Sequence, residues 1–232
     1  MVDPTGRFAD YYDTNGNWQF TDNIRDNKVY VVTQVNEPDG STNYIPQDLG
    51  ITHTEFQKRA ATAYGESSAF RSGATTDLAN EMKAIAYVNQ RNSVAYGANN
   101  SQAQAFINTS LQNRTGKMQF ANAAIINQLM GGPDPSNNAT MWDGAEQALF
   151  PASDKRTSVP PLTRKGPNWE LHQNTMGWDI SNQHYATWKA NVGKGFKAPQ
   201  TTQAVPGTRN AGKTRLHSTA VYGRTIFWRV TP

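Results

Sequence analysis

The sequence contains no cysteine, and it has neither a long apolar run nor a dense cluster of charge. Without cysteine, the chain holds no disulfide framework, no cysteine-ligated zinc ion and no thiol nucleophile. A membrane-spanning helix needs about 18 or more apolar residues in a row, and no segment approaches that length, so we expect no membrane insertion. Residues 1–5 lack the basic and apolar regions of a secretory signal, so we expect any export to use another route.

Charge is also sparse, since charged residues make up 17% of the chain and the net charge is +4. This mild positive balance suits nucleic acid, an acidic cell-wall polymer or a membrane surface. No run of five or more basic residues occurs, which disfavours nucleic acid as a partner. The four histidines lack the paired spacing of a metal site, so we expect no metal and no cofactor. His53 is interpreted as a surface residue.

Aromatic residues, in contrast, are plentiful, with nine Tyr, nine Phe and six Trp. They supply enough apolar surface for a folded core. A chain of 232 residues accommodates one good-sized core or a core with a small appendage. We therefore expect residues 1–50 to form an extended, hairpin-containing segment, and residues 51–232 to form one compact domain. We also expect the protein to be a monomer.

The pattern of apolar residues predicts a mainly α, α+β fold with small hairpins at both ends. β-branched residues at 28–35 indicate a strand of a hairpin. Thr52 and Glu55 have the spacing of a capping box that begins a helix, and Gly65 is expected to end or loosen it, which places Glu66 at its C-terminal edge. Helical periodicity predicts further helices at 76–91, 100–113, 117–130, 138–149 and 181–192, and residues 218–230 read as a strand or hairpin. Glu81 and Glu146 are interpreted as charges on helix surfaces.

Glu66 is the residue with the clearest chemical potential, because it follows an apolar helix and precedes a polar loop. Desolvation at such a helix end raises the pKa of a carboxyl group, which can then protonate a glycosidic oxygen. The catalytic acid of lysozyme is a known example of this pattern. An ordinary surface charge at a helix end is the alternative, and spacing alone favours it. Ser67 is expected to cap the helix or to orient Glu66.

One stretch of the sequence carries a family resemblance. Tyr64-Gly65-Glu66, followed by a helix containing residues 84–91 (Ala-Ile-Ala-Tyr-Val-Asn-Gln-Arg), resembles the cell-wall hydrolases related to the spore-cortex-lytic enzymes. The resemblance covers about residues 55–91. It implies a lysozyme-like helical fold, cleavage of the glycan strands of peptidoglycan, and Glu66 as the catalytic acid.

Two downstream segments resemble muramidase effector domains delivered by type VI secretion. They are residues 141–144 (Met-Trp-Asp-Gly) and residues 218–225 (Ser-Thr-Ala-Val-Tyr-Gly-Arg-Thr). That resemblance implies an antibacterial toxin domain that is secreted by a non-classical route, acts in the periplasm or cell wall of a target bacterium, and has an immunity protein as partner.

The second catalytic group remains open between Asp143 and the substrate itself. Retaining and inverting glycosidases use two carboxylates, whereas some murein-cleaving enzymes use one acid with substrate assistance. Asp143 follows Trp142, whose ring could stack on a sugar, although a surface Asp beside a core Trp is about equally compatible with the sequence. Aromatic and amide side chains suit a glycan groove. The candidates for substrate binding are Tyr64, Ser67, Asn89, Arg91, Trp142, Tyr222 and Trp178.

The sequence thus predicts a lysozyme or lytic transglycosylase acting on bacterial peptidoglycan, with Glu66 as general acid. A non-catalytic module that binds murein or another glycan is the alternative. A nucleic-acid-binding toxin is a third interpretation, which the missing basic stripe disfavours.

Overall fold

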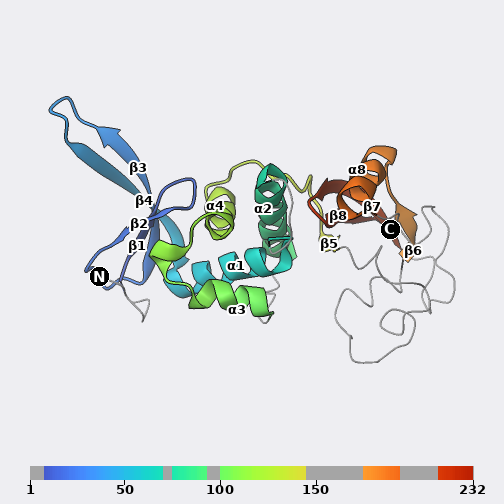
Figure 1. The fold of residues 1–232 in the computed structure, drawn as a ribbon, viewed down its shortest axis with the longest axis horizontal. Coiled ribbons are helices and arrows are strands. Elements are labelled where there is room, and N and C mark those ends of the chain that lie inside the picture. Colours follow the sequence, from blue (N-terminus) through green and yellow to red (C-terminus); the bar gives the residue numbers. More distant parts are fainter. Residues whose placement is uncertain (1–7, 70–74, 93–99, 145–174, 194–213, 232) are drawn as a thin grey trace. The chain divides into compact units, whose positions relative to one another are not determined.

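The computed structural model describes residues 8–69, 75–92, 100–144, 175–193 and 214–231 (Figure 1). The chain divides into two compact units, residues 1–135 and residues 136–232. The first unit contains a mixed sheet followed by a group of helices, and the second contains a small sheet with a helix packed on it. The fold is therefore α+β, with helices in the middle of the chain and strands near both ends, as the sequence predicts.

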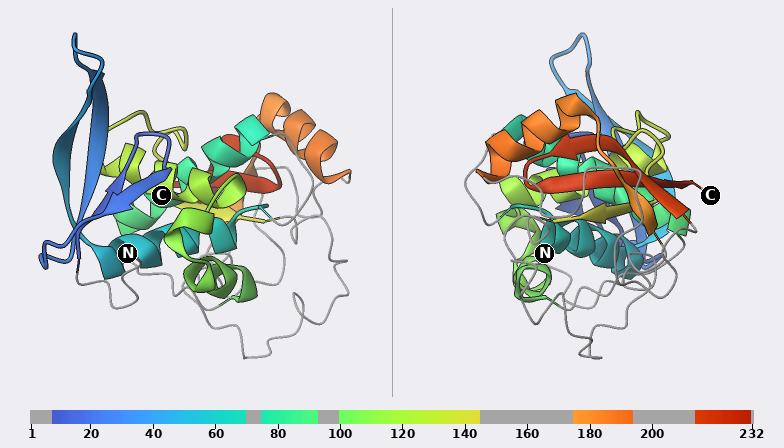
Figure 2. Two further views of the ribbon diagram at one scale, coloured as in Figure 1. Left: turned by 60° about the vertical axis from the view of Figure 1, so that its left-hand side comes forward. Right: turned by 90° about the vertical axis from the view of Figure 1, so that its right-hand side faces the viewer.

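The sheet of the first unit consists of β1 (Asp10–Tyr12), β2 (Trp18–Thr21), β3 (Lys28–Asn36) and β4 (Thr42–Thr52) in the order β2-β1-β3-β4. The β3–β4 hairpin extends beyond the helices of this unit (Figures 1 and 2), and its residues 38–48 are exposed. Edge strand β4 contains Pro46, which donates no hydrogen bond and so hinders pairing with another chain. The predicted N-terminal hairpin is thus confirmed.

Four α-helices complete the described part of the first unit. They are α1 (His53–Glu66), α2 (Thr75–Asn92), α3 (Ser101–Asn108) and α4 (Lys117–Leu129), with a 3-10 turn, η1 (Leu111–Asn113), between α3 and α4. Helix α1 contacts α2, α3 and α4, and α2 also packs along α4. The largest side chains buried between these helices are those of Phe56, Met82, Ile85, Phe106, Ile125 and Ile126. Helix α1 is therefore central to this group.

The predicted boundaries of these helices hold with one exception. The cap of α1 is confirmed, because Thr52 Oγ1 accepts a hydrogen bond from Glu55 N at 3.2 Å. Glu66 lies at the C-terminal edge of α1, as predicted, although Gly65 is itself helical and α1 ends one residue later, at Glu66. The helix predicted at 100–113 ends at Asn108 instead. The side chain of Arg114 donates hydrogen bonds to the carbonyl oxygens of Thr109 and Ile107, at 2.9 and 3.2 Å.

A partly buried contact between a histidine and an aspartate joins the sheet to the start of α1. The Nδ1 atom of His53 contacts the carboxylate of Asp10, and their side chains are 14% and 1% exposed. Thr21 Oγ1 donates to the same carboxylate at 2.6 Å. The prediction that His53 is a surface residue is therefore wrong, because the fold brings the first turn of α1 against β1.

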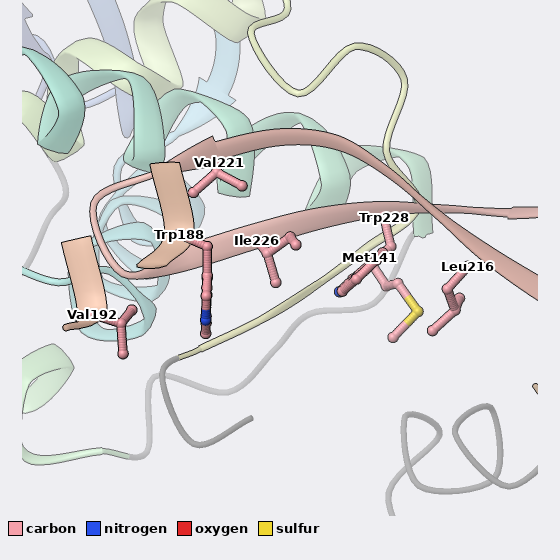
Figure 3. Close-up of a cluster of buried hydrophobic side chains, with 7 residues drawn as sticks. All are labelled: Met141, Trp188, Val192, Leu216, Val221, Ile226 and Trp228. Atoms are coloured by element: carbon pink, nitrogen blue, oxygen red, sulfur yellow. The ribbon is translucent and has the colours of Figure 1, made fainter. Parts of the chain in front are cut away.

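The second unit is a four-stranded sheet covered by one helix in its described part. Its strands β5 (Met141–Asp143), β6 (Thr175–Asp179), β7 (Thr214–Tyr222) and β8 (Thr225–Thr231) lie in the order β5-β8-β7-β6, and α8 spans Asn182–Val192. The core of this unit is a cluster of side chains from α8 and the sheet (Figure 3): Met141, Trp188, Val192, Leu216, Val221, Ile226 and Trp228. The predicted helix at 181–192 and the predicted C-terminal hairpin are both confirmed.

The prediction of a helix at 138–149 is wrong for the residues of this range that the structure describes, 138–144. Asn137 and Asn138 have φ angles of 51° and 62°, a left-handed conformation that no helix continues. Strand β5 then pairs antiparallel with β8, and Met141 is buried in the core of this unit. The backbone bonds to a distant strand rather than to itself, so tertiary pairing overrides the helical spacing. Residues 145–149, with Glu146, lie outside the described residues.

Candidate active site

Glu66 is the last residue of α1, and one side chain from the start of α3 fixes its surroundings. Asn100 caps α3 through Oδ1, which accepts from Ala103 N at 2.8 Å. Its Nδ2 donates to Gly65 O at 3.0 Å and to Glu66 Oε1 at 3.2 Å. Asn100 therefore begins one helix, satisfies a carbonyl at the end of another and orients the Glu66 carboxyl group.

The absence of a side chain at Gly65 makes this arrangement possible. A Cβ atom at Gly65 would lie 2.6 Å from Asn100 Oδ1 and 2.8 Å from Ala103 Cβ. Both distances are shorter than contacts between such atoms allow, so any larger residue would push α3 away from α1. Gly65 thus serves close packing of two helices, and not the termination that the sequence suggests.

The turn that follows Glu66 is held by several hydrogen bonds. Ser67 is the C-cap of α1 and is 3% exposed. Its Oγ donates to Tyr64 O at 2.8 Å and accepts from Ala69 N at 3.3 Å. Lys117, the first residue of α4, donates from Nζ to Ala69 O at 2.7 Å. Ser67 therefore binds backbone atoms of the helix end, which agrees with the capping role expected for it.

Glu81 on α2 supplies a second carboxylate beside this turn. Its Oε2 accepts from Ser68 N at 3.0 Å, and its Oε1 accepts from Ser68 Oγ at 2.9 Å. The residue is 0% exposed. The interpretation of Glu81 as a surface charge is thus wrong, because it faces the end of α1 and not solvent.

The environment of Glu66 itself differs from the sequence-based expectation. Its side chain is exposed, so the described surroundings do not provide the desolvation that a buried helix end would give. Tyr64, two residues earlier, is half-buried and lies with its ring 5.6 Å from that of Phe106 on α3. Burial raises the pKa of the Tyr64 hydroxyl group. Tyr64 therefore remains a neutral phenol near the end of α1.

Asn89 and Arg91 lie on the last turns of α2, where neighbouring side chains support the chain after α4. Arg91 Nη1 bonds to Asp134 Oδ2 at 2.7 Å, and the hydroxyl group of Tyr87 donates to Gly132 O. Asn89 Oδ1 is buried, with no hydrogen-bond partner among the described residues. Arg91 thus bonds to the chain after α4, and contact of Asn89 and Arg91 with substrate stays a prediction.

The remaining sequence candidates belong to the second unit. Trp142 and Asp143 lie on β5, opposite Phe227 and Ile226 of β8. The ring of Tyr222, at the end of β7, is 6.1 Å from that of Phe227 and tilted by 59°. Trp178 lies on β6, paired with Leu216. The role of Asp143 as partner of Glu66 stays a prediction, because the two residues belong to different units.

A groove of about 570 Å³ lies elsewhere on the first unit, between α2, α4 and the turn after β1. Amide side chains, one lysine, one aromatic ring and one methionine are among the residues that line it: Asn15, Asn17, Lys83, Gln119, Phe120, Asn127 and Met130. Glu66 is not part of its lining. The groove is therefore a separate feature from the carboxyl groups at the end of α1.

Sequence reasoning misses Asn100, Ser68 and Glu81. The position of Asn100 directly before a helix is typical of an N-cap and is a usable signal. Glu81 lies three residues after Leu78 and four before Ile85, both buried, so helical spacing puts it on the apolar face. Its bond to Ser68 joins residues 13 positions apart and has no local signature.

Comparison with known proteins adds no relative, since no protein-family model, no curated protein and no solved structure matches the chain. In the described ranges, His, Asp and Glu side chains form no group of three or more that could hold a metal ion. Nor do those ranges contain a helix of the length and apolarity that crossing a membrane requires.

Proposed function

We propose that the protein cleaves the glycan strands of bacterial peptidoglycan, as a lysozyme or a lytic transglycosylase, with Glu66 as general acid. The observation that carries this proposal is the support of one exposed carboxyl group at a helix end. Asn100 bonds to it at 3.2 Å, and the turn after it is bonded by Lys117 and Glu81. A carboxyl group that transfers a proton must be held in place relative to the bond that breaks.

The chemistry assigned to Glu66 is transfer of one proton. Because Oε1 accepts from Asn100, the proton of the acid form resides on Oε2. It passes to the glycosidic oxygen while the bond between that oxygen and the sugar carbon breaks, and the bonding electrons leave with the oxygen. Water then adds to the sugar carbon, or a hydroxyl group of the same sugar closes an anhydro ring. In either case the attacking oxygen loses a proton, which the Glu66 carboxylate, or Asp143 as base, accepts.

Substrate binding supports the acid role of an exposed carboxyl group. A glycan strand lying over Glu66 excludes water from it, and this loss of hydration favours the protonated form. The second carboxylate in the proposal is Asp143, with assistance from the substrate as the alternative. Tyr64, Trp142 and Tyr222 are the aromatic groups proposed to pack on sugar rings, and Asn89 and Arg91 are proposed polar contacts.

The proposal is tested by Glu66→Gln, which preserves size and the bond from Asn100 but removes the acid. We expect the rate of turbidity loss of purified peptidoglycan to fall roughly a hundredfold to ten-thousandfold. Glu55→Gln is the matched control, because Glu55 lies on the same helix and is paired with Arg59 at a partly exposed site. Glu66→Gln with unchanged activity and an unchanged circular dichroism spectrum would refute the assignment.

The groove favours a second candidate function, a non-catalytic glycan-binding module. Its amide oxygens can accept hydrogen bonds from sugar hydroxyl groups, Lys83 can pair with a carboxylate, and Phe120 offers a flat apolar face. Cosedimentation with murein that is lost in Phe120→Ala and retained in Glu66→Gln, without release of soluble fragments, would favour this function.

We further propose that the domain is an antibacterial effector that acts in the periplasm or cell wall of a target bacterium and is neutralised by an immunity protein. The resemblance of residues 141–144 and 218–225 to muramidase effector domains delivered by type VI secretion supports this proposal. The protein directed to the periplasm of a test strain should lyse it, whereas the same protein kept in the cytoplasm should not. Equal toxicity in both compartments would instead favour a nucleic-acid target.

A further inference from the structure

Glu81 is a carboxylate with no exposure to solvent in the middle of α2. Burial of an ionisable group is costly unless hydrogen bonds replace its hydration. Both oxygens of Glu81 take part in such bonds with one residue: Ser68 donates through N at 3.0 Å and through Oγ at 2.9 Å. The carboxylate therefore fixes the position and the orientation of Ser68.

Ser68 follows Glu66 by two residues, so its position limits where the end of α1 can move. Only Ser67 lies between them, and the turn is also held at Ala69, whose N donates to Ser67 Oγ and whose O accepts from Lys117 Nζ. Bonds of Ser68 N–H and Oγ–H to a carboxylate are charge-assisted and thus stronger than neutral ones. Among the bonds described for this turn, only those to Glu81 tie it to α2, the helix next along the chain.

We propose that Glu81 is a positioning residue for Glu66, acting through Ser68, and that it takes no direct part in bond cleavage. This inference rests on the proposed function of Glu66. It assigns the two carboxylates different roles. Glu66, which is exposed, contacts the substrate, and Glu81, which is buried, holds the turn that follows Glu66.

The two roles are separable because glutamine can replace a positioning carboxylate. In Glu81→Gln, the amide oxygen still accepts from Ser68 N, and the amide nitrogen donates to Ser68 Oγ, since a hydroxyl group also accepts. We therefore expect Glu81→Gln to lower kcat by no more than about threefold. Glu81→Ala removes both bonds, and we expect it to lower kcat by about a hundredfold with little change in KM, because Glu66 is misplaced while sugar binding is intact.

The control is Asp77→Asn, which removes a negative charge from the first turn of the same helix and should retain full activity. If Glu81→Ala does not fold, Ser68→Ala replaces it, because it deletes only the hydroxyl bond. We expect it to lower kcat by about tenfold. Full activity in Glu81→Ala or in Ser68→Ala overturns the proposal. Glu81→Gln as inactive as Glu66→Gln also overturns it and assigns Glu81 to direct catalysis.

Amide hydrogen exchange separates a failure of this inference from a failure of the proposed function. If the native protein does not cleave murein, the function of Glu66 fails, but the bond from Ser68 N to Glu81 can still be tested. Exchange of the Ser68 amide, followed by NMR, should be at least about tenfold faster in Glu81→Ala than in the native protein and nearly unchanged in Glu81→Gln. An equal rate in Glu81→Ala overturns the positioning role whatever the substrate.

Discussion

Asn100 combines a structural and a functional role in one side chain. It caps α3 through Oδ1 and bonds to Gly65 O and to Glu66 Oε1 through Nδ2. An aspartate in its place can still cap the helix, since Asp and Asn are equally good N-caps. It cannot donate to Glu66, and its own charge would repel the Glu66 carboxylate. Capping and orientation can therefore be tested separately at this residue.

We predict that Asn100→Ala lowers both stability and activity, whereas Asn100→Asp lowers mainly activity. Loss of the cap in Asn100→Ala costs about 1 kcal/mol of unfolding free energy, measured by urea denaturation. In Asn100→Asp, murein cleavage should fall by roughly tenfold or more, because general acid catalysis depends on the orientation of Glu66. Equal activity of Asn100→Asp and the native protein would show that this bond does not orient the acid.

At the scale of elements, the N-terminus of α8 is bonded to β7 through a histidine. Ser181 Oγ caps α8 by accepting from His184 N at 3.2 Å, and Ser218 Oγ on β7 accepts from Ser181 N at 3.1 Å. His184 Nδ1 lies 2.8 Å from the same Ser218 Oγ. Burial lowers the pKa of His184 below its ordinary value of 6.5, against a smaller opposing effect of a hydrogen bond with the backbone of Ser218. The fold thus favours neutral His184.

This histidine predicts a pH dependence for the second unit. The unfolded chain binds a proton at His184 more readily than the folded chain does, so the stabilising effect is complete above pH 6.5, the ordinary pKa, and is lost as pH falls below it. We expect the unfolding free energy, followed by tryptophan fluorescence, to decrease as pH falls from 7 towards 5. His184→Gln should flatten this part of the pH profile. An identical profile in the variant would contradict the assignment.

Elements with strong local signals are predictable from the sequence, and those set by distant contacts are not. The cap at Thr52 and the periodicity of α2 act within a few residues, so the sequence predicts α1 and α2. Strand β5 depends on pairing with β8, more than 80 residues away in sequence, and its local spacing predicts a helix instead. The candidate site divides in the same way: Glu66 is identified from its flanking residues, whereas the bond of Glu81 to Ser68 requires the fold.

At the scale of the whole molecule, charge is distributed unequally between the two units. Residues 136–232 contain 12 of the 22 Lys and Arg but 5 of the 18 Asp and Glu, a net charge of +7. Residues 1–135 contain the other 10 Lys and Arg and the other 13 Asp and Glu, which gives a net charge of −3. The positive balance inferred from the whole sequence thus belongs to the second unit, and the unit that contains Glu66 is acidic.

This distribution predicts that the second unit provides the attraction to an anionic polymer. Binding of insoluble murein, measured by cosedimentation of Glu66→Gln, should weaken as sodium chloride rises to about 0.5 M, because salt screens exposed charges. Lys189→Glu on α8 should weaken binding more than Lys58→Glu on α1, both lysines being exposed. Equal effects of the two reversals would contradict a specific role for the second unit.

The most direct test of the central claim is mass spectrometry of the soluble fragments released from purified peptidoglycan. The native protein should release disaccharide-containing muropeptides with reducing or anhydro sugar ends, the first from hydrolysis and the second from intramolecular closure. Glu66→Gln, at the same concentration and with the same folded spectrum, should release none. Fragments cut only in their peptides, or equal release by both proteins, would contradict Glu66 as the acid that breaks the glycan strand.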